Sequence, residues 1–372
     1  MNTISIIGAG IGGLTLGNIL KQHEYDFTIY ESAPEIKPVG AGIMMAVNAM
    51  QVFDRLGLKE KIENAGNKIH RISLANESMR VFSKTEILDL ETQYNSCNVA
   101  IYRAELQRIL TENLDKNSIK LAHSLQKIGK NENYTLDFEN GAQIESNIVF
   151  GADGIKSAIR NQILKTGIIR SSGQKCWRGL VDFELPEQNH HEAFEMWGKG
   201  KRFGFVKISE RKVYWYACIN EKSFGRYLKL IDIFKDFAPL ILQLIEATAE
   251  ENIICNDISD LAPIPKWYAE NLCLIGDAAH ATTPNMGQGA CQAIEDAYII
   301  GRLLETNRDF NAVFEEFQNI RRKKVDYIVN TSRTIGKISQ WEHGNVFRNF
   351  LMGMIPESMN QKMAKKIIEL EM

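Results

Sequence analysis

The stretch that decides the fold is NLCLIGDAAHATTPNMGQGACQAIEDAYIIGRLL, residues 271–304. Its apolar start predicts a buried strand over Leu272–Ile275, and this strand ends at Gly276-Asp277, where a carboxylate can meet a ligand. A loop with Pro284 and Gly287-Gln288-Gly289 follows and leads into a long helix. The free N–H groups and positive dipole end of such a helix stabilise negative charge in front of it. We therefore predict a ligand site at this loop, with Asp277 holding a polar chain of the same ligand.

A second glycine-rich turn, GAGIGG at residues 8–13, lies near the N-terminus. It follows a predicted strand over Thr3–Ile7 and precedes a predicted helix that runs through Leu20. A second predicted strand, Asp26–Tyr30, ends at Glu31. Strand, glycine turn, helix, strand and acid follow in the order of a dinucleotide-binding fingerprint, although a merely tight βαβ turn is the alternative.

The glycines and the acid of this fingerprint have separate roles. Gly8 allows the tight turn, Gly10 lets the backbone approach a pyrophosphate, and Gly13 lets the helix pack closely on the strand. Glu31 can accept hydrogen bonds from the hydroxyls of an adenosine ribose. The fingerprint does not distinguish NAD from FAD. The small-residue loop Pro38–Ile43, where an extended ribityl chain could lie, favours FAD.

A third strand that ends at an acid is predicted over Ile144–Phe150, followed by Gly151-Ala152-Asp153-Gly154. Taken alone, this pattern is also that of an ordinary Asp-Gly turn. Because Glu31 and Asp277 end strands in the same way, we expect the three carboxylates to converge on one flavin. The negative charge at the Gly287 loop would then be that of the reduced flavin ring.

Composition narrows the class of protein. The chain has 372 residues and a net charge of −2, with 24% charged and 44% hydrophobic residues, as in globular enzymes. Basic residues are not concentrated in any stretch, which argues against nucleic acid as a partner. The six cysteines form no C-x-x-C pair, so we expect no metal site and reduced thiols in a cytoplasm. No apolar run is long enough to span a bilayer, and the N-terminus is predicted as a strand rather than a signal peptide.

The chain resembles the single-component, FAD-dependent aromatic-ring monooxygenases, the group that includes salicylate and para-hydroxybenzoate hydroxylases. GAGIGG at 8–13, GADGIKSAIR at 151–160 and GDAAHATTPNMGQGACQAIEDA at 276–297 match its three signatures in order. The resemblance covers residue 3 to about residue 330. It implies a bound FAD, NADPH or NADH that binds only in passing, and dioxygen as a co-substrate.

The resemblance and the fingerprint together give the expected cofactor-binding residues. Asp153 matches an Asp shared between FAD and the path of the pyridine nucleotide, and Gly287 to Cys291 match the loop against the pyrimidine end of the flavin. Arg103, at the start of a predicted helix through Leu114, is unfavourably placed for the helix dipole, which indicates a ligand contact; a solvated surface arginine is the alternative. The full set is Gly8, Gly10, Gly12, Gly13, Glu31, Ser32, Met44, Arg103, Leu125, Asp153, Asp277, Pro284, Gly287, Gln288, Gly289, Ala290 and Cys291.

An aromatic-rich region, residues 175–219, is the expected substrate region. Cys176–Phe183, Phe203–Ile208 and Val213–Ile219 are predicted as strands of an antiparallel sheet over the flavin. Such a sheet could form an apolar pocket for a planar substrate, although most of its aromatic side chains are expected to be core.

Four polar residues are candidates for handling the substrate. Arg202 and Arg178 could each pair with a carboxylate, phenolate or enolate, and Tyr214 could exchange a proton near it. The segment resembles the urate hydroxylase branch, in which positions matching Arg202 and Tyr214 assist substrate activation, so these two are the expected catalytic residues. That branch has Asp where this chain has Asn285 and Asn where it has Arg178; Asn285 matches a set that includes zeaxanthin epoxidase-like proteins.

The resemblance implies a specific reaction. NAD(P)H reduces FAD, dioxygen adds to give a C4a-hydroperoxyflavin, and one oxygen atom is transferred to an aromatic or heterocyclic substrate by hydroxylation or epoxidation. Pro284 would shape the dry wall that protects this chemistry. The alternatives are an antibiotic-modifying flavin monooxygenase, a flavoprotein oxidase or dehydrogenase, and a non-catalytic FAD-binding sensor.

Two further features are open to more than one interpretation. His280 could be a general base, but a structural histidine after the cofactor Asp is the preferred interpretation. The apolar face of 347–355 could touch a membrane or a partner, and we expect it instead to pack on its own protein.

The expected fold class is α/β, with a Rossmann-like FAD-binding domain of the GR2 type, an inserted antiparallel-sheet substrate domain and C-terminal helices. The expected boundaries are 1–70, 100–165 and 266–330 for the FAD-binding domain, 71–99 and 166–265 for the substrate domain, and 331–372 for the terminal helices. A small-molecule substrate is the expected partner, and the chain is expected to be a monomer or homodimer.

Overall fold

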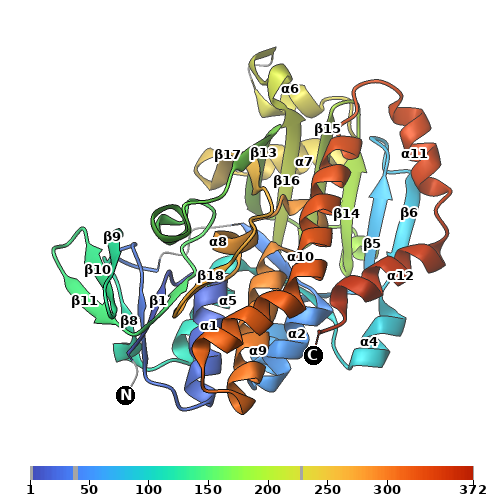
Figure 1. The fold of residues 1–372 in the computed structure, drawn as a ribbon. Helices are drawn as coiled ribbons and strands as arrows, with labels where there is room; N and C mark the ends of the chain where they lie inside the picture. The colour runs from blue at the N-terminus through green and yellow to red at the C-terminus, as the bar shows by residue number, and fades with distance from the viewer. Residues whose placement is uncertain (1–2, 37–40, 227–228, 372) are drawn as a thin grey trace.

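The computed structural model describes residues 3–36, 41–226 and 229–371. Its first sheet has six strands in the order β18-β19-β12-β1-β2-β8 (Figure 1). These strands are β18 (Tyr268–Ala269), β19 (Leu272–Leu274), β12 (Ile148–Gly151), β1 (Ile4–Ile7), β2 (Phe27–Tyr30) and β8 (Ile119–Lys120). All neighbours are parallel except the edge pair β18–β19. The first sheet is therefore the parallel sheet of a Rossmann-like fold, as the sequence predicts.

The strand register sets the position of the three acids. Tyr30, Ile7, Gly151 and Leu274 lie level across β2, β1, β12 and β19. Parallel strands end at the same edge of a sheet, so the residues that follow all emerge on that edge. Neighbouring strands are about 4.8 Å apart, so the row from β2 to β19 spans roughly 14 Å. An edge of this length suits an extended ligand.

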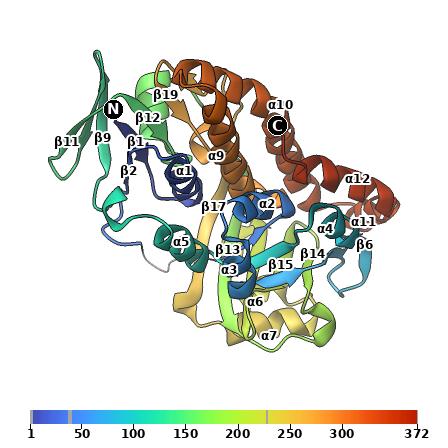
Figure 2. The same cartoon turned by 90° about the horizontal axis from the view of Figure 1, so that it is seen from below.

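Helices cover this sheet and form the main core. α1 (Ile11–Gln22) and α9 (Gly289–Thr306) pack against each other, and the long α10 (Phe310–Ser339) lies along α9 (Figure 2). α2 (Val47–Arg55), α3 (Lys59–Ala65) and α5 (Arg103–Glu112) complete the layer. α8 (Asp277–His280) is one short turn between β19 and the α9 loop.

The second sheet has seven strands in the order β17-β13-β16-β15-β14-β5-β6. They are β17 (Ile253–Leu261), β13 (Ile169–Asp182), β16 (Lys212–Asn220), β15 (Lys201–Lys207), β14 (Glu192–Trp197), β5 (Arg71–Ala75) and β6 (Val81–Glu86). α6 (Leu230–Phe234) and α7 (Pro239–Ala247) cover its outer face (Figure 1). The predicted antiparallel strands over 176–219 are present, although β5 and β14 pair in parallel.

Two smaller sheets complete the fold. β3 (Gly42–Met45), β7 (Asn98–Tyr102) and β4 (Asn67–Ile69) form one antiparallel sheet, and β9 (Leu125–Lys130), β10 (Tyr134–Phe138) and β11 (Gln143–Ser146) form the other. The remaining helix on this side, α4 (Leu88–Tyr94), follows β6. Of the loop expected to hold a ribityl chain, Pro38, Val39 and Gly40 lie outside the described residues.

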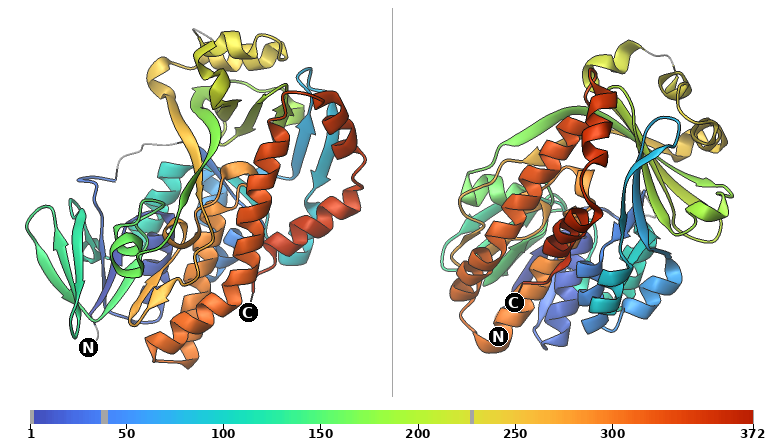
Figure 3. Two further views of the ribbon diagram at one scale, coloured as in Figure 1. Left: turned by 45° about the horizontal axis from the view of Figure 1, so that its top comes forward. Right: turned by 90° about the vertical axis from the view of Figure 1, so that its right-hand side faces the viewer.

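Three terminal helices end the chain: α10, α11 (Asn345–Gly353) and α12 (Glu357–Ile368), the last two lying at the β6 edge of the second sheet (Figure 3). The expectation that the apolar residues of 347–355 pack on their own protein is wrong for most of them. Phe347, Phe350, Leu351 and Met354 are between 44% and 64% exposed, because α11 buries its polar residues instead.

Helices in the described residues fall short of a membrane span: each is either too short or too polar to cross a bilayer. Among the same residues, His, Cys, Asp and Glu side chains do not gather in threes at any position where they could hold a metal ion. All six cysteines are free. The domain boundaries expected from the sequence remain a prediction.

Candidate active site at the carboxyl edge of the parallel sheet

The first glycine turn has the geometry that its sequence predicts. Gly8 has a φ of 107°, and a Cβ there would lie 2.5 Å from the carbonyl oxygen of Ala152. A Cβ at Gly13 would lie 2.0 Å from the carbonyl oxygen of Gly8, so only glycine lets α1 approach β1 this closely. A Cβ at Gly10, in contrast, would meet nothing within 4 Å. The turn therefore packs tightly on its protein side and is open on the side where a pyrophosphate would approach.

Glu31, directly after β2, lies against this turn. Its Oε2 accepts a hydrogen bond from the backbone N–H of Ala9 at 2.7 Å, and its Oε1 accepts from Ser32 Oγ at 3.0 Å and from Ala33 N at 2.9 Å. These contacts fix the carboxylate beside the glycine turn. Ser32 thus orients Glu31 and lies at the same edge.

Asp153 follows β12 and has one carboxylate oxygen without a partner. Its Oδ2 accepts from the N–H of Ile159 at 3.2 Å, whereas Oδ1 is buried and has no hydrogen-bond partner among the described residues. Burial raises the pKa of Asp153, although hydrogen bonds from Ser157 and Ile159 act in the opposite direction. Leaving a buried carboxylate oxygen without a hydrogen bond costs free energy, so we expect a ligand to donate a hydrogen bond to Oδ1.

Asp277 begins α8, and its side chain is exposed although the residues on both sides of it are buried. The buried protein around its carboxylate nevertheless raises its pKa, and the nearby His280 and Arg103 act against that shift. Arg103, the first residue of α5, therefore lies near Asp277. Pro284 and Gly287 on the next loop are likewise exposed. These exposed residues on a buried framework leave this edge of the sheet open to a ligand, and the open edge is called the cleft below.

The loop before α9 presents its backbone to the same cleft. Gly287 has a φ of 62° and follows a short turn over Pro284–Met286, and Gln288 is the N-terminal capping residue of α9. Gly289 and Ala290 form the first turn of the helix, which has no acidic side chain. No side chain of this first turn therefore offsets the positive end of the helix dipole, which stays available to a negatively charged ligand.

The remaining predicted cofactor residues lie beside this cleft or pack against the helices and strands around it. A Cβ at Gly287 would lie 3.7 Å from Met44 Cε, and one at Gly12 would lie 3.0 Å from Ala293 Cβ. Cys291 is buried, and its Sγ accepts a hydrogen bond from Ala46 N at 3.5 Å; burial raises the pKa of this thiol to about 12. It is thus a neutral packing group. Leu125 begins β9 and packs against the main core.

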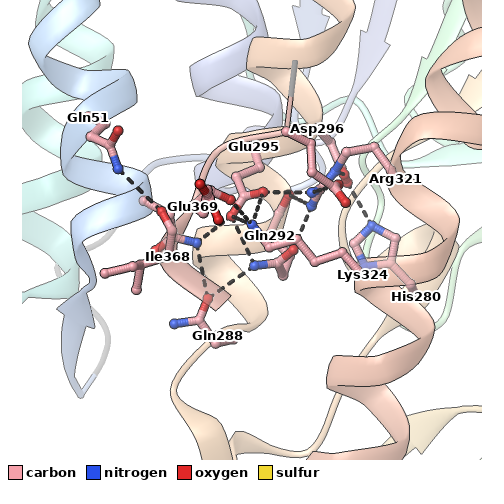
Figure 4. Close-up of polar contacts among 12 residues, drawn as sticks. Gln51, His280, Gln288, Gln292, Glu295, Asp296, Arg321, Lys324, Ile368 and Glu369 are labelled. Atoms are coloured by element: carbon pink, nitrogen blue, oxygen red, sulfur yellow. Dashed lines mark hydrogen bonds and ion pairs between the residues drawn. The ribbon is translucent and has the colours of Figure 1, made fainter. Parts of the chain in front are cut away.

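A buried charge network holds α9 and its loop in place (Figure 4). Arg321 on α10 contacts Glu295 Oε2 through Nη1 at 2.6 Å and Asp296 Oδ1 through Nε at 3.0 Å. Lys324 Nζ lies 2.8 Å from Glu295 Oε2 and donates to the carbonyl oxygen of Glu369 at 2.7 Å. All four charged side chains are at most 6% exposed, so the two acids and two cations neutralise each other without water.

The network reaches the cleft at two points. Asp296 Oδ2 accepts from the N–H of Gly276 at 2.9 Å, next to Asp277. Gln288 Oε1 accepts from Gln292 Nε2 at 3.0 Å and from Asn48 Nδ2 at 3.1 Å. The network therefore fixes both the strand end that carries Asp277 and the loop that begins α9. Sequence reasoning missed Glu295, Arg321 and Lys324, because helical spacing does not reveal pairs formed between two helices.

His280 belongs to this support. Its Nε2 lies 2.7 Å from Asp296 Oδ2, and its ring packs 5.1 Å from that of Trp267. Burial alone would raise the pKa of Asp296, but His280 and Arg321 outweigh it and hold that pKa below its usual value. The contacts of His280 are thus those of a structural histidine.

The inner face of the second sheet brings the predicted substrate residues together. Side chains alternate along a strand, so Tyr214, Tyr216 and Cys218 of β16 share one face, and the register pairs Tyr216 with Arg178 and Cys218 with Arg202. The opposite face carries Phe203, Phe205 and Trp215 and is buried under α6 and α7. One face is therefore core, and the other carries polar groups.

Arg202 joins this face to the loop before α9. The side chain is 2% exposed, and Nη1 lies 3.1 Å from Glu195 Oε1. Nη2 donates to Oδ1 of Asn285, and Asn285 Nδ2 donates to the carbonyl oxygen of Ser332 at 2.8 Å. Arg202 Nε is buried without a partner among the described residues. Burial would lower the pKa of Arg202, but Cys218 and Glu195 outweigh it and raise that pKa.

Tyr214 and Arg178 lie further along the same face and are partly exposed. A Cβ at Gly42 would lie 2.5 Å from Tyr214 Cβ, so the second sheet touches β3 at this tyrosine. Burial raises the pKa of Tyr214, with Cys176 acting in the same direction and Arg178 against it. Arg178 Nη1 also donates to Asn256 Oδ1 at 3.3 Å. The four predicted substrate residues thus belong to one face and its adjoining loop.

Glu195 and Tyr216 on this face were missed from the sequence. β14, which carries Glu195, lacks the β-branched pattern that identified its neighbours. Tyr216 could have been predicted as a substrate-facing residue, because it is two residues from Tyr214 and therefore lies on the same face of the strand. Burial raises the pKa of Tyr216 strongly.

Comparison with known proteins assigns this arrangement of two sheets to the FAD-dependent monooxygenases of aromatic compounds. A family model described as "FAD binding domain" matches residues 1–237 and 240–309. The chain belongs to this FAD-binding family, and FAD is its cofactor.

Relatives whose names state an enzymatic activity support the assignment to this family. The chain is 34% identical over 92% of its length to an aurachin C monooxygenase/isomerase of Stigmatella aurantiaca, covering 90% of that protein. It is 31% identical over 98% of its length to a 2-heptyl-3-hydroxy-4(1H)-quinolone synthase of Pseudomonas aeruginosa, covering 97% of it. It is 30% identical to an FAD-dependent urate hydroxylase of Klebsiella pneumoniae, with 88% of each chain covered.

Solved structures show the same fold. Klebsiella pneumoniae HpxO complexed with FAD and uric acid superposes with a TM-score of 0.89 and 25% identity, over 99% of this chain and 97% of the other. A salicylate hydroxylase substrate complex gives a TM-score of 0.79 over 99% and 98% of the two chains; at 20% identity it supports the fold alone.

Proposed function

We propose that this protein is an NAD(P)H-driven monooxygenase that hydroxylates a fused nitrogen heteroaromatic ring, a 4(1H)-quinolone with an alkyl chain. The observation that carries the proposal is Arg202, a buried guanidinium whose Nε lacks a partner and which is tied to the flavin loop through Asn285. Such a group suits a ring oxygen that carries negative charge.

FAD fits the residues at the sheet edge. The unpaired Asp153 Oδ1, the open space beside Gly10 and the exposed Asp277 are three separate places that accept its polar groups. Glu31 and Ser32 would hold the adenosine ribose, and Arg103, Met44 and the loop from Pro284 to Cys291 would border the ring. When bound, FAD supplies hydride acceptance from NADPH or NADH and the activation of dioxygen.

The start of α9 would stabilise the ring in its reduced, negatively charged form. The N–H groups at Gly289 and Ala290 are not used by capping side chains, and the first turn has no acid to offset the dipole. Pro284 would help to exclude water from this part of the cleft.

Arg202, Asn285 and Tyr214 would prepare the substrate. A quinolone oxygen placed against Arg202 Nε would gain negative charge, which makes the neighbouring ring carbon electron-rich and prone to electrophilic oxygen transfer. Because its pKa is raised, Tyr214 stays a neutral phenol and can donate a hydrogen bond. Arg178, beside Tyr214, would orient the opposite side of the ring.

An apolar cluster beside Tyr214 would border the alkyl chain through its partly buried side chains. Val206, Ile208, Ile69 and Ala100 form its buried part, with Met44, Leu180 and Tyr214 packed against it. The name of one relative, 2-heptyl-3-hydroxy-4(1H)-quinolone synthase, supports this substrate class. The departures from the urate hydroxylase pattern at Asn285 and Arg178 argue against urate.

The experiment is a substrate panel: 2-heptyl-4(1H)-quinolone, unsubstituted 4-quinolone, urate, salicylate and a tetracycline. NADH or NADPH oxidation and the product mass are measured for each. We expect the alkylquinolone to stimulate oxidation most strongly and to gain one oxygen atom. Preferred turnover of urate or tetracycline would overturn the substrate class, and reduction of the flavin without oxygen transfer would indicate a dehydrogenase or oxidase.

We further propose a cytoplasmic location and a monomeric or homodimeric state. Six free cysteines, of which Cys255 is exposed, suit a reducing compartment. Fractionation of cells and light scattering of the purified protein test these two proposals.

A further inference from the structure

α11 has an inverted distribution of polar and apolar residues. Its buried residues are Arg348 and Asn349, whereas Val346, Phe347 and Phe350 are 76%, 60% and 63% exposed. Val346, Phe347, Phe350, Leu351 and Met354 recur at helical spacing and therefore form one outward stripe. A helix in a water-soluble protein normally turns its apolar stripe toward the core.

Specific contacts fix this orientation. Arg348 Nη2 donates to the carbonyl oxygens of Trp197 and Gly198 at 3.1 and 3.2 Å, and Nη1 donates to that of Ser339 at 2.7 Å. A Cβ at Gly353 would lie 2.8 Å from the carbonyl oxygen of Phe82 on β6. The helix cannot rotate its apolar stripe inward without breaking these buried contacts.

The exposed apolar surface continues beyond α11. Trp341 before it and Met359 on α12 are 42% and 54% exposed, and Val81 on the neighbouring β6 is 44% exposed. A hollow of about 470 Å³ beside α11 is lined by apolar residues that include Phe82, Val346 and Phe350, and by the oppositely charged Glu77 and Arg80. Contiguous apolar surface of this kind marks a binding site rather than scattered exposed residues.

Positive side chains flank this surface. Lys362 and Lys365 on α12 and Arg80 and Lys84 at β6 are exposed, whereas the ammonium of Lys366 lies 4.2 Å from the centre of the Tyr327 ring on α10. Lys84 pairs with Glu86 at 3.3 Å, while the exposed Glu357 is occupied by the N–H of Glu86 at 3.4 Å. An outward apolar stripe without charge, bordered by lysines, is the pattern of a helix that lies in a membrane interface.

We propose that α11 and the adjoining start of α12 dock this protein on the surface of a bilayer that contains anionic phospholipids. The apolar stripe would enter the headgroup region, the lysines would face lipid phosphates, and the hollow beside Arg80 would accept one acyl chain. A second copy fits less well, because a twofold contact through this surface would bring the same lysines of both copies together. The proposal does not depend on the proposed substrate.

Because α11 is bound to Trp197 of the second sheet, docking would hold that sheet next to lipid. Trp197 Nε1 donates to Glu195, the partner of Arg202, at 3.0 Å. The substrate face would thus lie a short distance from the membrane.

The test uses the holoenzyme and vesicles of phosphatidylcholine with one third phosphatidylglycerol. We expect the wild type to sediment with these vesicles, and Phe347→Ser/Phe350→Ser to lose about 10-fold or more in binding. Lys362→Glu/Lys365→Glu should weaken binding by a similar factor, as should pure phosphatidylcholine. Ile168→Ser/Ile254→Ser, exposed apolar residues at the opposite side of the second sheet, should bind like the wild type.

The FAD content of each variant shows that it is folded. The proposal is overturned if the wild type stays in the supernatant, or if the two serines leave vesicle binding unchanged. It is also overturned if the wild type is a dimer without lipid and the same serines make it a monomer, since the surface would then join two copies.

Discussion

Arg202 concentrates the chemistry of the site in one side chain. It is 2% exposed, it contacts Glu195 and Asn285, and its Nε has no partner among the described residues. A buried cation with a spare donor is costly unless a ligand uses that donor. The residue type was predictable from the sequence, but the pairing with Glu195 was not, because it depends on the register between β14 and β15.

Replacing Arg202 should therefore affect the substrate more than the cofactor. We expect Arg202→Gln to lower substrate-stimulated kcat/KM by about 100-fold, equivalent to roughly 2–3 kcal/mol, because one charge-assisted hydrogen bond is lost. Steady-state NAD(P)H oxidation measures it, and Arg211→Gln, an exposed residue in the turn between β15 and β16, is the control. A variant with normal kcat/KM would remove Arg202 from the reaction.

Asp153 gives a prediction for pH. Burial raises its pKa in the folded protein, so the folded state binds the proton more tightly than the unfolded state and loses stability as pH rises through that range. At pH 7 Asp153→Asn should therefore raise the Tm of the FAD-free protein by about 1–3 °C, with the gain disappearing as the pH falls to the usual Asp range. The same variant should bind FAD more weakly.

Thermal unfolding of the FAD-free protein across pH measures this effect, with the exposed Asp89→Asn as the control. A lower Tm for Asp153→Asn at pH 7 would show that the carboxylate is stabilising without ligand, contrary to its unpaired Oδ1.

At the scale of elements, β1 and α1 are held together by their glycines. The tight approach at Gly13 was predictable, because the fingerprint requires it and the distance of 2.0 Å to Gly8 O leaves no room for a Cβ. Gly13→Ala should abolish FAD binding, since α1 must move away from β1. Gly129→Ala on β9, where a Cβ meets nothing within 4 Å, should keep a full flavin content. The flavin absorbance per chain after purification measures the FAD content of the two variants.

α9 and α10 depend on their buried charges. Removing Arg321 leaves Glu295 and Asp296 without their main cation, so Arg321→Met should destabilise the protein by about 3–5 kcal/mol. Denaturant unfolding measures the change, and Lys323→Met, at an exposed position two residues further along α10, should have little effect. Equal stability of the two variants would show that the network contributes nothing to folding.

Elements differed in how well the sequence predicted them. Helix α9 and strand β19 follow from strong periodicity and from the Gly276-Asp277 signal, whereas β9 and β14 lack such a pattern and were missed. α6 and α7 are two separate helices, because Pro239 begins a new helix. The outward face of α11 could not be inferred, since its apolar spacing is equally that of a buried helix.

At the scale of the whole molecule, the second sheet meets the rest of the fold at the residues expected to handle cofactor and substrate. The parallel sheet brings Asp153 and Asp277 to its carboxyl edge. Among the contacts of the second sheet with the rest of the fold, Tyr214 packs against Gly42, and Arg202 donates to Asn285. The acids and glycines were predictable because each ends its own strand. The contacts between the sheets were not, because they join residues far apart in the chain.

The most direct test of the proposed function is the isotopic mass of the product formed from 2-heptyl-4(1H)-quinolone, with NAD(P)H, under heavy-isotope dioxygen in ordinary water. We predict a product that carries one heavy oxygen atom. A hydroxylated product with only the light isotope would contradict oxygen transfer from dioxygen at this site, because the oxygen would then have come from water.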